Sequence, residues 1–294
     1  MSEGPDHPPV AIFCSVNRPE ILHESVLCLT KQTAPCPIFI SVTSDADVSV
    51  LTRQLPGVEI IYGKRGASAQ RNRALRVIQG IPEFIAFFDD DVEVEAHYME
   101  ELQGTYREHS SVVLVNGANL AHDIYPPGTL TREISRQLIE DRLKKELPED
   151  NCLPAPGGYG SRMSFRGSLL GKVEFDERLP LYSYLEDYDF TLACRQFGDV
   201  AENPRALSVH IEVAGGRVRL DKRGYSEVVN PVYIALKNHV GFRSALWGAF
   251  RLTLRNARGA IFFRGKDRFR GNLVGWRKLL IGHIDPEYIL RMEE

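Results

Sequence analysis

The chain has 294 residues, a formal net charge of −3, and 43% hydrophobic and 26% charged residues. These fractions are typical of a globular protein, and the length can bury a sizeable core in one large domain or two small ones. The five cysteines are scattered and form no C-x-x-C pair, which argues against a disulfide framework or a zinc site and favours a reducing compartment. The polar residues 1–9 do not resemble a signal peptide, and no apolar run reaches the roughly 18 residues of a membrane-spanning helix.

Strands and helices alternate in the first third of the chain. Short apolar runs predict the strands, and Pro19 marks a helix start because its fixed φ suits the first helical turn. This β-α-β-α-β order indicates a parallel sheet with helices on both faces, whose ligands bind beyond the carboxyl ends of the strands. The expected strands cover residues 10–14, 37–42, 59–62 and 84–88, and the expected helices follow Pro19 and run from 69 to 78.

The fourth of these strands ends in three consecutive carboxylates, Asp89, Asp90 and Asp91. Its apolar, aromatic residues are typical of a strand buried on both faces. Three adjacent acids repel one another, and a divalent cation held by oxygen ligands is their natural partner; Mg²⁺ prefers one or two carboxylates together with substrate phosphates. The run therefore indicates a metal-dependent enzyme with a phosphorylated substrate. The alternative is a solvated acidic turn.

The middle of the chain is less regular, and its remainder is helical and basic. Apolar runs predict further strands, and charged amphipathic segments predict helices. The acids that open the second of these helices suit the positive end of its dipole. The expected strands cover residues 112–116, 163–165, 173–175 and 207–213, and the expected helices cover 129–147 and 184–196.

Several segments together resemble the inverting nucleotide-sugar glycosyltransferases of family 2, which have the Rossmann-like A-type fold. Each segment is a weak signal alone, but their order and spacing match the family from residue 10 to about 215. The resemblance implies a mostly parallel central sheet flanked by helices, with a basic helical C-terminal extension outside the shared core. The matching segments are residues 15–20, 29–33, 66–72, 89–91, 175–179 and 186–189, followed by His210.

The resemblance assigns the metal site to Asp91 and His210. In the family, the last aspartate of an Asp-x-Asp motif binds Mn²⁺ or Mg²⁺, which bridges the diphosphate of the donor. Asp89 then contacts the ribose or the donor sugar, and Asp90 sits between the two. The chemistry agrees, because a metal stabilises the charge that develops on a nucleoside diphosphate leaving group. The alternative for His210 is a satisfied core or surface histidine.

The nucleotide side is expected in the loops that follow the strands. Where the family often has Asp-Asp-Gly-Ser, this chain has Thr43-Ser44-Asp45-Ala46, which leaves the base of the donor open. The alternative for Arg71 is a surface salt bridge. The expected donor-contacting residues are Asn17 and Arg18 after the first strand, Asp45 after the second, Lys64 and Arg71 toward the diphosphate, and Asp89 with Asp90.

The pair Glu186-Asp187 resembles the Glu-Asp pair of the family, in which one carboxylate is the general base for the acceptor hydroxyl. A base within hydrogen-bond reach of that hydroxyl permits direct displacement with inversion. We assign the base to Asp187 and the shaping of the acceptor pocket to Glu186. The alternative is a pair of helix N-terminal acids that only stabilise the dipole. Asp189 is expected to have a capping or structural role.

The C-terminal region is basic and aromatic. From Gly241 onward, eleven basic residues stand against five acidic ones, so the region carries about +6 and the preceding 240 residues about −9. Residues 242–280 suit an amphipathic helix pair on an anionic membrane surface. One alternative is docking of this region on the catalytic domain. A nucleic-acid partner is the other, and we discount it because the rest of the chain is acidic. The expected domains are a flexible N-terminus at 1–9, a catalytic domain at 10–240 with halves 10–115 and 116–240, and the basic region at 241–294.

The predicted function is transfer of a sugar from a nucleotide-sugar donor to a hydroxyl acceptor, a glycan or lipid-linked saccharide of a surface polysaccharide pathway. Two alternatives remain at this point. A Mg²⁺-dependent nucleotidyltransferase needs a glycine-rich phosphate loop after the first strand, and residues 14–18 contain no glycine. A non-catalytic sugar-nucleotide-binding scaffold is disfavoured by the complete metal and base positions. The expected location is cytoplasmic, at the inner face of the cell membrane if the basic region binds lipid.

Overall fold

A computed structural model describes residues 7–121, 124–126, 128–181, 184–213, 218–262 and 266–292. The chain divides into two compact units. The first unit consists of residues 1–65, 70–174 and 190–216, and the second of residues 66–69, 175–189 and 217–294. Most of the expected flexible N-terminus lies outside the described residues, as do Phe263 and Arg264 of the basic region. The expected domain boundaries stay predictions.

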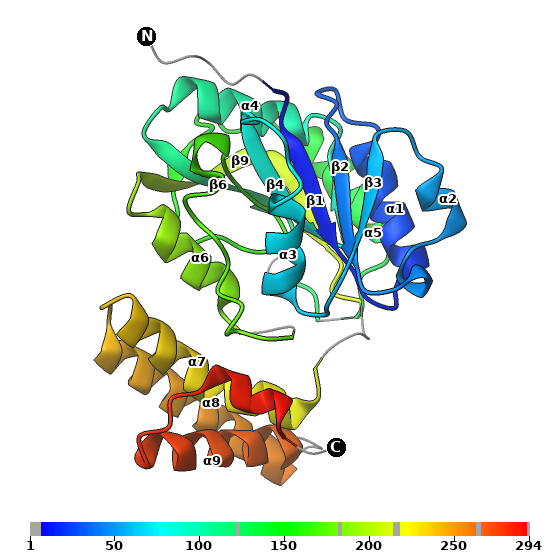
Figure 1. Cartoon of the computed structure of the whole chain (residues 1–294). Coiled ribbons are helices and arrows are strands. Elements are labelled where there is room, and N and C mark those ends of the chain that lie inside the picture. Colours follow the sequence, from blue (N-terminus) through cyan, green and yellow to red (C-terminus); the bar gives the residue numbers. More distant parts are fainter. Residues whose placement is uncertain are drawn as a thin grey trace. The chain divides into compact units, whose positions relative to one another are not determined.

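A single mixed sheet forms the centre of the first unit (Figure 1). Four strands pair in parallel in the order β3 (Val58–Tyr62), β2 (Ile38–Val42), β1 (Val10–Cys14) and β4 (Phe84–Asp89). The remaining strands are β8 (Met163–Arg166), antiparallel between β4 and β6 (Val112–Asn119); β9 (Asp199–His210), parallel to β6; and β5 (Val92–Val94) and β7 (Leu153–Pro154), both antiparallel to β9. The predicted α/β class is confirmed.

Helices connect the strands of the first unit and cover its sheet. Two of them cross the boundary between the units, because the first residues of α3 and of α6 belong to the second unit. The helices are α1 (Pro19–Leu29), α2 (Val50–Arg53), α3 (Ala67–Leu75), α4 (Tyr98–Glu108), α5 (Arg132–Leu143) and α6 (Glu186–Cys194), with single 3-10 turns at η1 (Asp45–Asp47) and η2 (Gly167–Leu169).

The strand that carries the acids is buried on both faces, as its apolar sequence predicts. On one face, Phe88 stacks with Phe13 of β1 and meets Tyr98 of α4, at ring-centroid distances of 5.5 and 5.6 Å. On the other face, Phe87 contacts Phe165 of β8 and Phe190 of α6, at 5.8 and 6.1 Å. Aromatic burial of this kind dominates core energetics, so the end of β4 is rigidly placed.

One expected strand was wrong, and several elements were not predicted, of which α4 is the longest. Residues 173–175 form no strand, although Val173 has an isolated bridge to Leu170. Val173 and Phe175 are buried, so their apolar character reports burial in a loop and not a strand. The helix α4 was not predicted, although its buried residues recur at helical spacing; they are Tyr98, Met99, Leu102, Thr105 and Tyr106.

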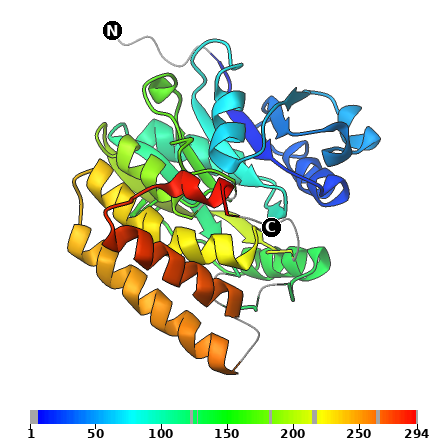
Figure 2. The same cartoon turned by 60° about the horizontal axis from the view of Figure 1, so that its bottom comes forward.

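The second unit is a helical assembly of α7 (Leu220–Lys237), α8 (Phe242–Phe262) and α9 (Lys266–Leu280), closed by the 3-10 turns of η3 (Pro286–Leu290). Figure 2 shows the three helices side by side. Helix α7 is in contact with both α8 and α9. Two glycines allow α7 and α9 to approach closely. A Cβ on Gly224 would lie 2.0 Å from the carbonyl oxygen of Arg268, and one on Gly271 would lie 1.9 Å from that of Asp221.

A buried polar network joins the three helices. The Glu227 carboxylate of α7 accepts hydrogen bonds from Arg268 Nε at 3.0 and 3.1 Å and from Asn256 Nδ2 at 2.9 Å. Asn256 also donates to Asn272 Oδ1 at 2.9 Å, and Asn272 donates to the Gly224 carbonyl at 2.8 Å. Burial alone would raise the pKa of Glu227, but the hydrogen bonds and charge of Arg268 outweigh it and lower that pKa.

We expect Glu227→Ala to lower the free energy of unfolding by about 3 kcal/mol, because it leaves the Arg268 guanidinium without its buried counter-charge. In the unmodified chain, Glu227 has a folded-state pKa below the ordinary 4.5, so its contribution is present above pH 4.5 and is lost as the pH falls through the folded value. Chemical denaturation across this pH range measures both effects. The control Glu287→Ala, at an exposed position of the same unit, should stay within about 0.5 kcal/mol. Equal losses in the two variants would contradict this account.

Candidate active site

The acid triplet lies where β4 ends, at the carboxyl edge of the parallel strands. Asp89 is the last residue of β4 and pairs in register with Cys14, the last residue of β1. The chain then turns into β5, whose first residue, Val92, pairs with His210 at the end of β9. This antiparallel pairing brings a histidine 119 residues along the chain to the acids.

Asp89, Asp91 and His210 form a compact group of potential metal ligands, whose candidate atoms lie within 4.8 Å of one another. His210 Nε2 is 3.0 Å from Asp91 Oδ1 and 3.5 Å from Asp89 Oδ2. Burial would lower the pKa of His210, but the two carboxylates outweigh it and raise the pKa to about 9. Burial would likewise raise the pKa of Asp91, but the hydrogen bond and charge of His210 lower it. Both shifts have the same cause, the attraction between the carboxylates and the imidazole that they face.

The second oxygen of Asp91 is held from the opposite side. Asp91 Oδ2 accepts a hydrogen bond from the Val213 amide at 2.9 Å and lies 3.3 Å from an Arg18 amino group. Arg18 also donates to the Val213 carbonyl at 2.8 Å. The loop after β1 and the segment after β9 thereby fix the orientation of the Asp91 carboxylate, as outer-sphere partners do for metal ligands.

The middle acid, Asp90, is buried and engaged within the protein. Its two carboxylate oxygens accept hydrogen bonds from Ser15 Oγ at 2.6 Å and Arg18 at 2.9 Å. Burial, reinforced by the charge of Asp91, raises the pKa of Asp90 to about 6. Ser15 had no predicted role of its own, although it opens the matched segment 15–20. These contacts indicate that Asp90 helps to position Arg18, which also faces Asp91.

Arg71, expected to contact the diphosphate, lies beside the first acid. Arg71 is buried, with 4% of its surface exposed. Its guanidinium is 3.6 Å from Asp89 Oδ1 and lies over the Phe87 ring. A Cβ on Gly160 would fall 2.4 Å from an Arg71 amino group, so a side chain at this position would displace the Arg71 guanidinium. Gln70, the preceding residue, donates to the Ser15 and Ser41 carbonyls and ties the β1 and β2 ends together.

The loop after β2 is organised by Asp47, which the sequence analysis did not assign. Asp47 is fully buried, and its Oδ1 accepts the Asn17 amide at 2.7 Å. Its Oδ2 accepts the Thr43 hydroxyl at 2.6 Å and the amides of Thr43 and Ser44 at 2.8 and 2.9 Å. Asn17 itself has a φ of 58°, which this bond helps to hold. A sequence signal existed, because Ser44 and Asp47 form a capping box.

Two predicted donor contacts lie at the surface. Asp45 is 86% exposed and pairs with Arg53 at 2.8 Å and with the Tyr62 hydroxyl at 2.8 Å. Lys64 is exposed, and its carbonyl accepts a hydrogen bond from Arg73 at 3.1 Å. The structure brings Arg18, Arg71, Asp89, Asp90, Asp91 and His210 together, whereas the roles of Asp45 and Lys64 stay predictions.

The acids of the loop after β2 make a matched pair for mutation. We expect Asp47→Ala to lower the free energy of unfolding by roughly 3 kcal/mol, because four hydrogen-bond donors lose the buried carboxylate that accepts from them. It should also raise the KM for the sugar donor, because the loops after β1 and β2 lose their common anchor. Asp45→Ala should leave the melting temperature unchanged, and it raises the KM for the donor only if Asp45 contacts the base. Thermal melts and donor titrations measure both; a larger loss of stability from Asp45→Ala would contradict the assignment.

The pair Glu186-Asp187, which contains the predicted general base, lies at the start of α6 in the second unit. Leu185, just before it, has a φ of 70°, an unusual value for a bulky residue, which sets the direction of the first helical turn. Glu186 is buried and Asp187 is half-buried. Asp187 Oδ1 accepts the Tyr188 amide at 2.8 Å.

Helix α7 anchors the segment around this pair. Lys237 Nζ donates to Asp176 at 2.9 Å and to Asp189 at 2.6 Å, and Asn238 donates to Asp189 at 2.9 Å. Asn230 Nδ2 donates to the Tyr184 carbonyl at 2.9 Å. The structural role expected for Asp189 is therefore visible, and residues 176–189 are held at both ends by one helix.

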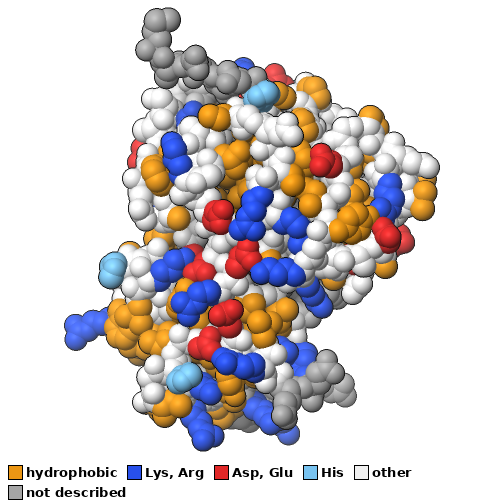
Figure 3. Space-filling view, viewed as in Figure 1, with side chains coloured by type: hydrophobic (Ala, Val, Ile, Leu, Met, Phe, Trp, Pro, Cys, Tyr) orange, Lys and Arg blue, Asp and Glu red, His pale blue; other side chains and the backbone are white. Residues whose placement is uncertain are grey.

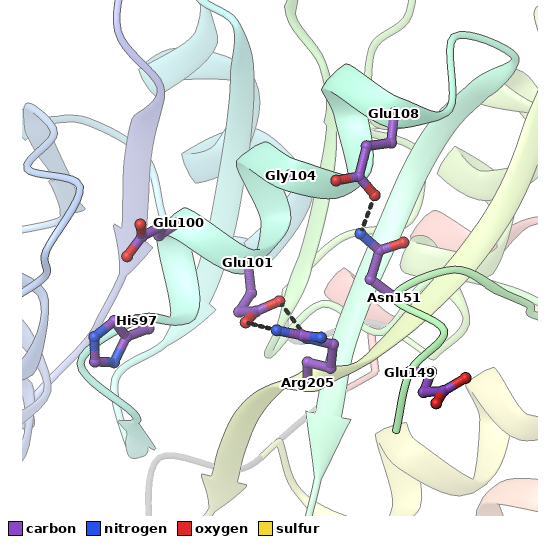
Figure 4. A pocket seen from close by; sticks show the side chains of 8 residues that line it. All are labelled: His97, Glu100, Glu101, Gly104, Glu108, Glu149, Asn151 and Arg205. Atoms are coloured by element: carbon purple, nitrogen blue, oxygen red, sulfur yellow. Dashed lines mark hydrogen bonds and ion pairs between the residues drawn. The ribbon is translucent and has the colours of Figure 1, made fainter. Parts of the chain in front are cut away.

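A separate hollow of about 390 Å³ lies along α4 (Figure 4). Two of its acids are engaged: Glu101 accepts both Nε and an amino group of Arg205 at 3.0 and 3.1 Å, and Glu108 accepts Asn151 Nδ2 at 2.6 Å. None of the three metal-ligand candidates lines it, so it is not the predicted site. Its lining residues are His97, Glu100, Glu101, Gly104, Glu108, Glu149, Asn151 and Arg205.

Solved structures of glycosyltransferases share this fold. Residues 1–349 of S. aureus TarS align with a TM-score of 0.54 at 15% identity, over 83% of this chain and 70% of that one. GalNAc-T7 with UDP, GalNAc and Mn²⁺ aligns with a TM-score of 0.55 at 14% identity, over 78% and 47% of the two chains. Mannosyltransferase PcManGT from Pyrobaculum calidifontis, in complex with GDP-Man and Mn²⁺, aligns with 0.54 at 14% identity, over 95% and 89%. The A-type glycosyltransferase fold is confirmed.

Residues 11–164, more than half of the chain, match the family described as Glycosyl transferase family 2. The chain therefore belongs to glycosyl transferase family 2, and the resemblance carried by its motifs is confirmed. A comparison with curated proteins finds no match.

Proposed function

We propose that this chain transfers a sugar from a nucleotide-sugar donor to a hydroxyl group of an acceptor, with a bound divalent cation and with inversion at the transferred carbon. The observation that carries the proposal is the convergence of Asp89, Asp91 and His210 at the carboxyl edge of the sheet in a family 2 chain. Two structural neighbours, GalNAc-T7 and PcManGT, hold a nucleotide or nucleotide sugar together with Mn²⁺, which supports the donor class and the cofactor.

The residues present fit Mn²⁺ or Mg²⁺. Two carboxylates and one imidazole, with their ligand atoms within 4.8 Å, are a donor set that suits such cations, especially Mn²⁺. We assign the cation to Asp91 and His210, with Asp89 beside them toward the donor. His210 Nε2 would release its proton on binding, because imidazole binds metals in its neutral form. When bound, the cation would stabilise the charge that develops on the leaving diphosphate.

The surrounding residues divide between donor contact and support. We assign Arg71 and Lys64 to the negative charge of the donor, and Asn17 and Asp45 to its nucleoside. Arg18, predicted as a donor contact, has contacts in this structure that favour a positioning role, because it binds both Asp90 and Asp91. Asp90, whose oxygens are engaged by Ser15 and Arg18, supports the same arrangement.

In the proposed step, Asp187 takes the proton from the acceptor hydroxyl as its oxygen attacks the anomeric carbon of the donor sugar. The new carbon–oxygen bond forms as the bond to the diphosphate oxygen breaks, and the nucleoside diphosphate leaves with that electron pair. Attack opposite the leaving group inverts the configuration. Glu186, buried beside the base, is assigned to the shape of the acceptor pocket.

For the acceptor, we propose a glycan or a lipid-linked saccharide. A lipid-linked acceptor would require contact with a membrane surface, for which residues 242–280 are the expected region. Among the residues that the structure describes, no helix combines the length and the apolar character needed to cross a membrane. A cytoplasmic place at the inner face of the membrane is part of this proposal.

The experiment that tests the function is a thermal-shift panel of UDP-, GDP- and dTDP-sugars, each with and without Mn²⁺. A ligand that binds the native state raises the melting temperature by mass action. We expect a shift that needs Mn²⁺ with one donor class, followed by release of the matching nucleoside diphosphate when acceptors are added. No shift with any donor would overturn the proposal in favour of a scaffold.

A further inference from the structure

One face of α8 is buried and another is exposed. Ala249, Thr253 and Asn256 are buried, and Trp276 of α9 donates to Thr253 Oγ1 at 2.9 Å, so this face packs inside the second unit. The other face exposes Trp247, Phe250 and Leu254 by 59%, 42% and 47%. These three residues follow at helical spacing and form one outward strip, whose two rings stack at 5.7 Å.

The charges around this strip have one sign. Helix α8 contains four arginines and no acidic residue. Arg243, Arg251, Arg255 and Arg258 are exposed, and the structure gives none of them an ion pair with a described acid. Helix α9 adds exposed Arg270, Leu273 and Arg277 at the same spacing, with Asp267 as its acidic residue. Figure 3 shows basic and apolar side chains together at the surface in the part of the view where α8 and α9 lie.

This combination favours one occupant over its rivals. A second copy bound through the same strip would set the arginines of α8 against one another, with no acid on α8 to compensate. Nucleic acid would match the arginines and the rings of Trp247 and Phe250, but it would leave Leu254 and Leu273 without a partner, since they offer it neither stacking nor hydrogen bonds. An anionic bilayer matches both components, because phosphate groups pair with arginine while Trp, Phe and Leu enter the boundary between headgroups and acyl chains.

We propose that the outward face of α8, here called the Trp247 face and formed by Arg243, Trp247, Phe250, Arg251, Leu254 and Arg258, lies on the surface of an anionic lipid bilayer. The inference deepens the proposed function, which expects membrane contact through residues 242–280, by naming the helix face and the lipid charge; the transfer reaction itself is not needed for it. It concerns the placement of the enzyme at a membrane, where a lipid-linked acceptor would be found.

The test is co-sedimentation of the full chain with phosphatidylcholine vesicles that contain either no anionic lipid or about one third phosphatidylglycerol. We expect binding to the anionic vesicles and a loss of at least tenfold in affinity for the triple variant Trp247→Ser, Phe250→Ser, Leu254→Ser. The double variant Arg251→Gln, Arg258→Gln should also lose about tenfold and should depend less on salt. All five side chains are exposed, so the fold should persist.

Matched controls remove the same chemistry elsewhere. Val50→Ser with Leu51→Ser deletes two exposed apolar side chains, and Lys31→Gln with Lys145→Gln deletes two exposed charges. Both should bind vesicles like the unmodified chain. Equal losses in the controls, or no binding to anionic vesicles, would overturn the proposal. The proposal would also be overturned if the unmodified chain bound RNA or formed a dimer but did not bind vesicles, and if the Trp247-face variants abolished that RNA binding or dimer. Because vesicle binding needs no donor, its failure is distinct from failure of sugar transfer.

Discussion

Asp91→Asn is expected to lower kcat/KM for sugar transfer by about a thousandfold. The variant keeps an oxygen for the Val213 amide but loses the charge that faces His210. Loss of a cation that stabilises the leaving group corresponds to several kcal/mol of transition-state energy, which gives this magnitude. Binding of Mn²⁺, measured by electron paramagnetic resonance or calorimetry, should weaken by about a hundredfold or more, because substitutions of mere outer-sphere residues already cost 10- to 100-fold.

The matched control is Asp141→Asn, an exposed carboxylate on α5. It should change neither Mn²⁺ binding nor turnover. Circular dichroism and a thermal melt establish that Asp91→Asn still folds. If that variant binds Mn²⁺ with unchanged affinity and keeps its donor-dependent thermal shift, then Asp91 is not the metal ligand.

The parallel strands and the acid triplet could be predicted because both have strong local signals. The run Phe84–Asp89 is apolar over its buried length, a pattern typical of a strand covered on both faces. The alternation of elements then places its end beside the end of β1, which the register of Asp89 with Cys14 shows. Here local pattern and topology agree, which is the condition under which sequence reasoning succeeds.

The remaining parts of the site depend on contacts between distant segments. His210 meets Asp91 only because the three-residue strand β5 pairs with β9, and three residues are too few for a periodic signal. The family spacing suggested His210, but nothing in the sequence placed the Val213 amide on Asp91. The capping box with Ser44 is a sequence signal for Asp47. The family position instead favours Asp45 as the donor contact of this loop.

The second unit shows why a composition of basic and aromatic residues leaves alternatives open. Composition cannot separate residues that dock from residues that face solvent. In the structure, α8 does both: Ala249 is buried inside the unit while Trp247 is exposed. Helix α7 adds a role that composition could not indicate, because Lys237 and Asn238 bind Asp189 beside the predicted base. Helix α7 thus binds residues 176 and 189 as well as packing against α8 and α9.

Asp187→Asn is expected to lower kcat by about a hundred- to ten-thousandfold, the range that a positioned general base contributes. Its amide keeps an oxygen for the Tyr188 amide, so α6 should start as before. The dissociation constant of the nucleotide-sugar donor in the presence of Mn²⁺ should stay within about twofold, because donor and metal ligands are assigned to other residues. Pre-steady-state transfer assays and calorimetry separate the two quantities.

The control for Asp187→Asn is Glu287→Gln, an exposed carboxylate in the same unit, which should leave both kcat and donor affinity unchanged. Loss of donor binding in Asp187→Asn together with loss of turnover would assign the residue to the donor site. Full turnover in this variant would leave Asp187 as a helix N-terminal acid that only stabilises the dipole, and the base would then have to be sought in Glu186. A loss of turnover alone, at unchanged donor affinity, is the result that places the proton transfer at Asp187.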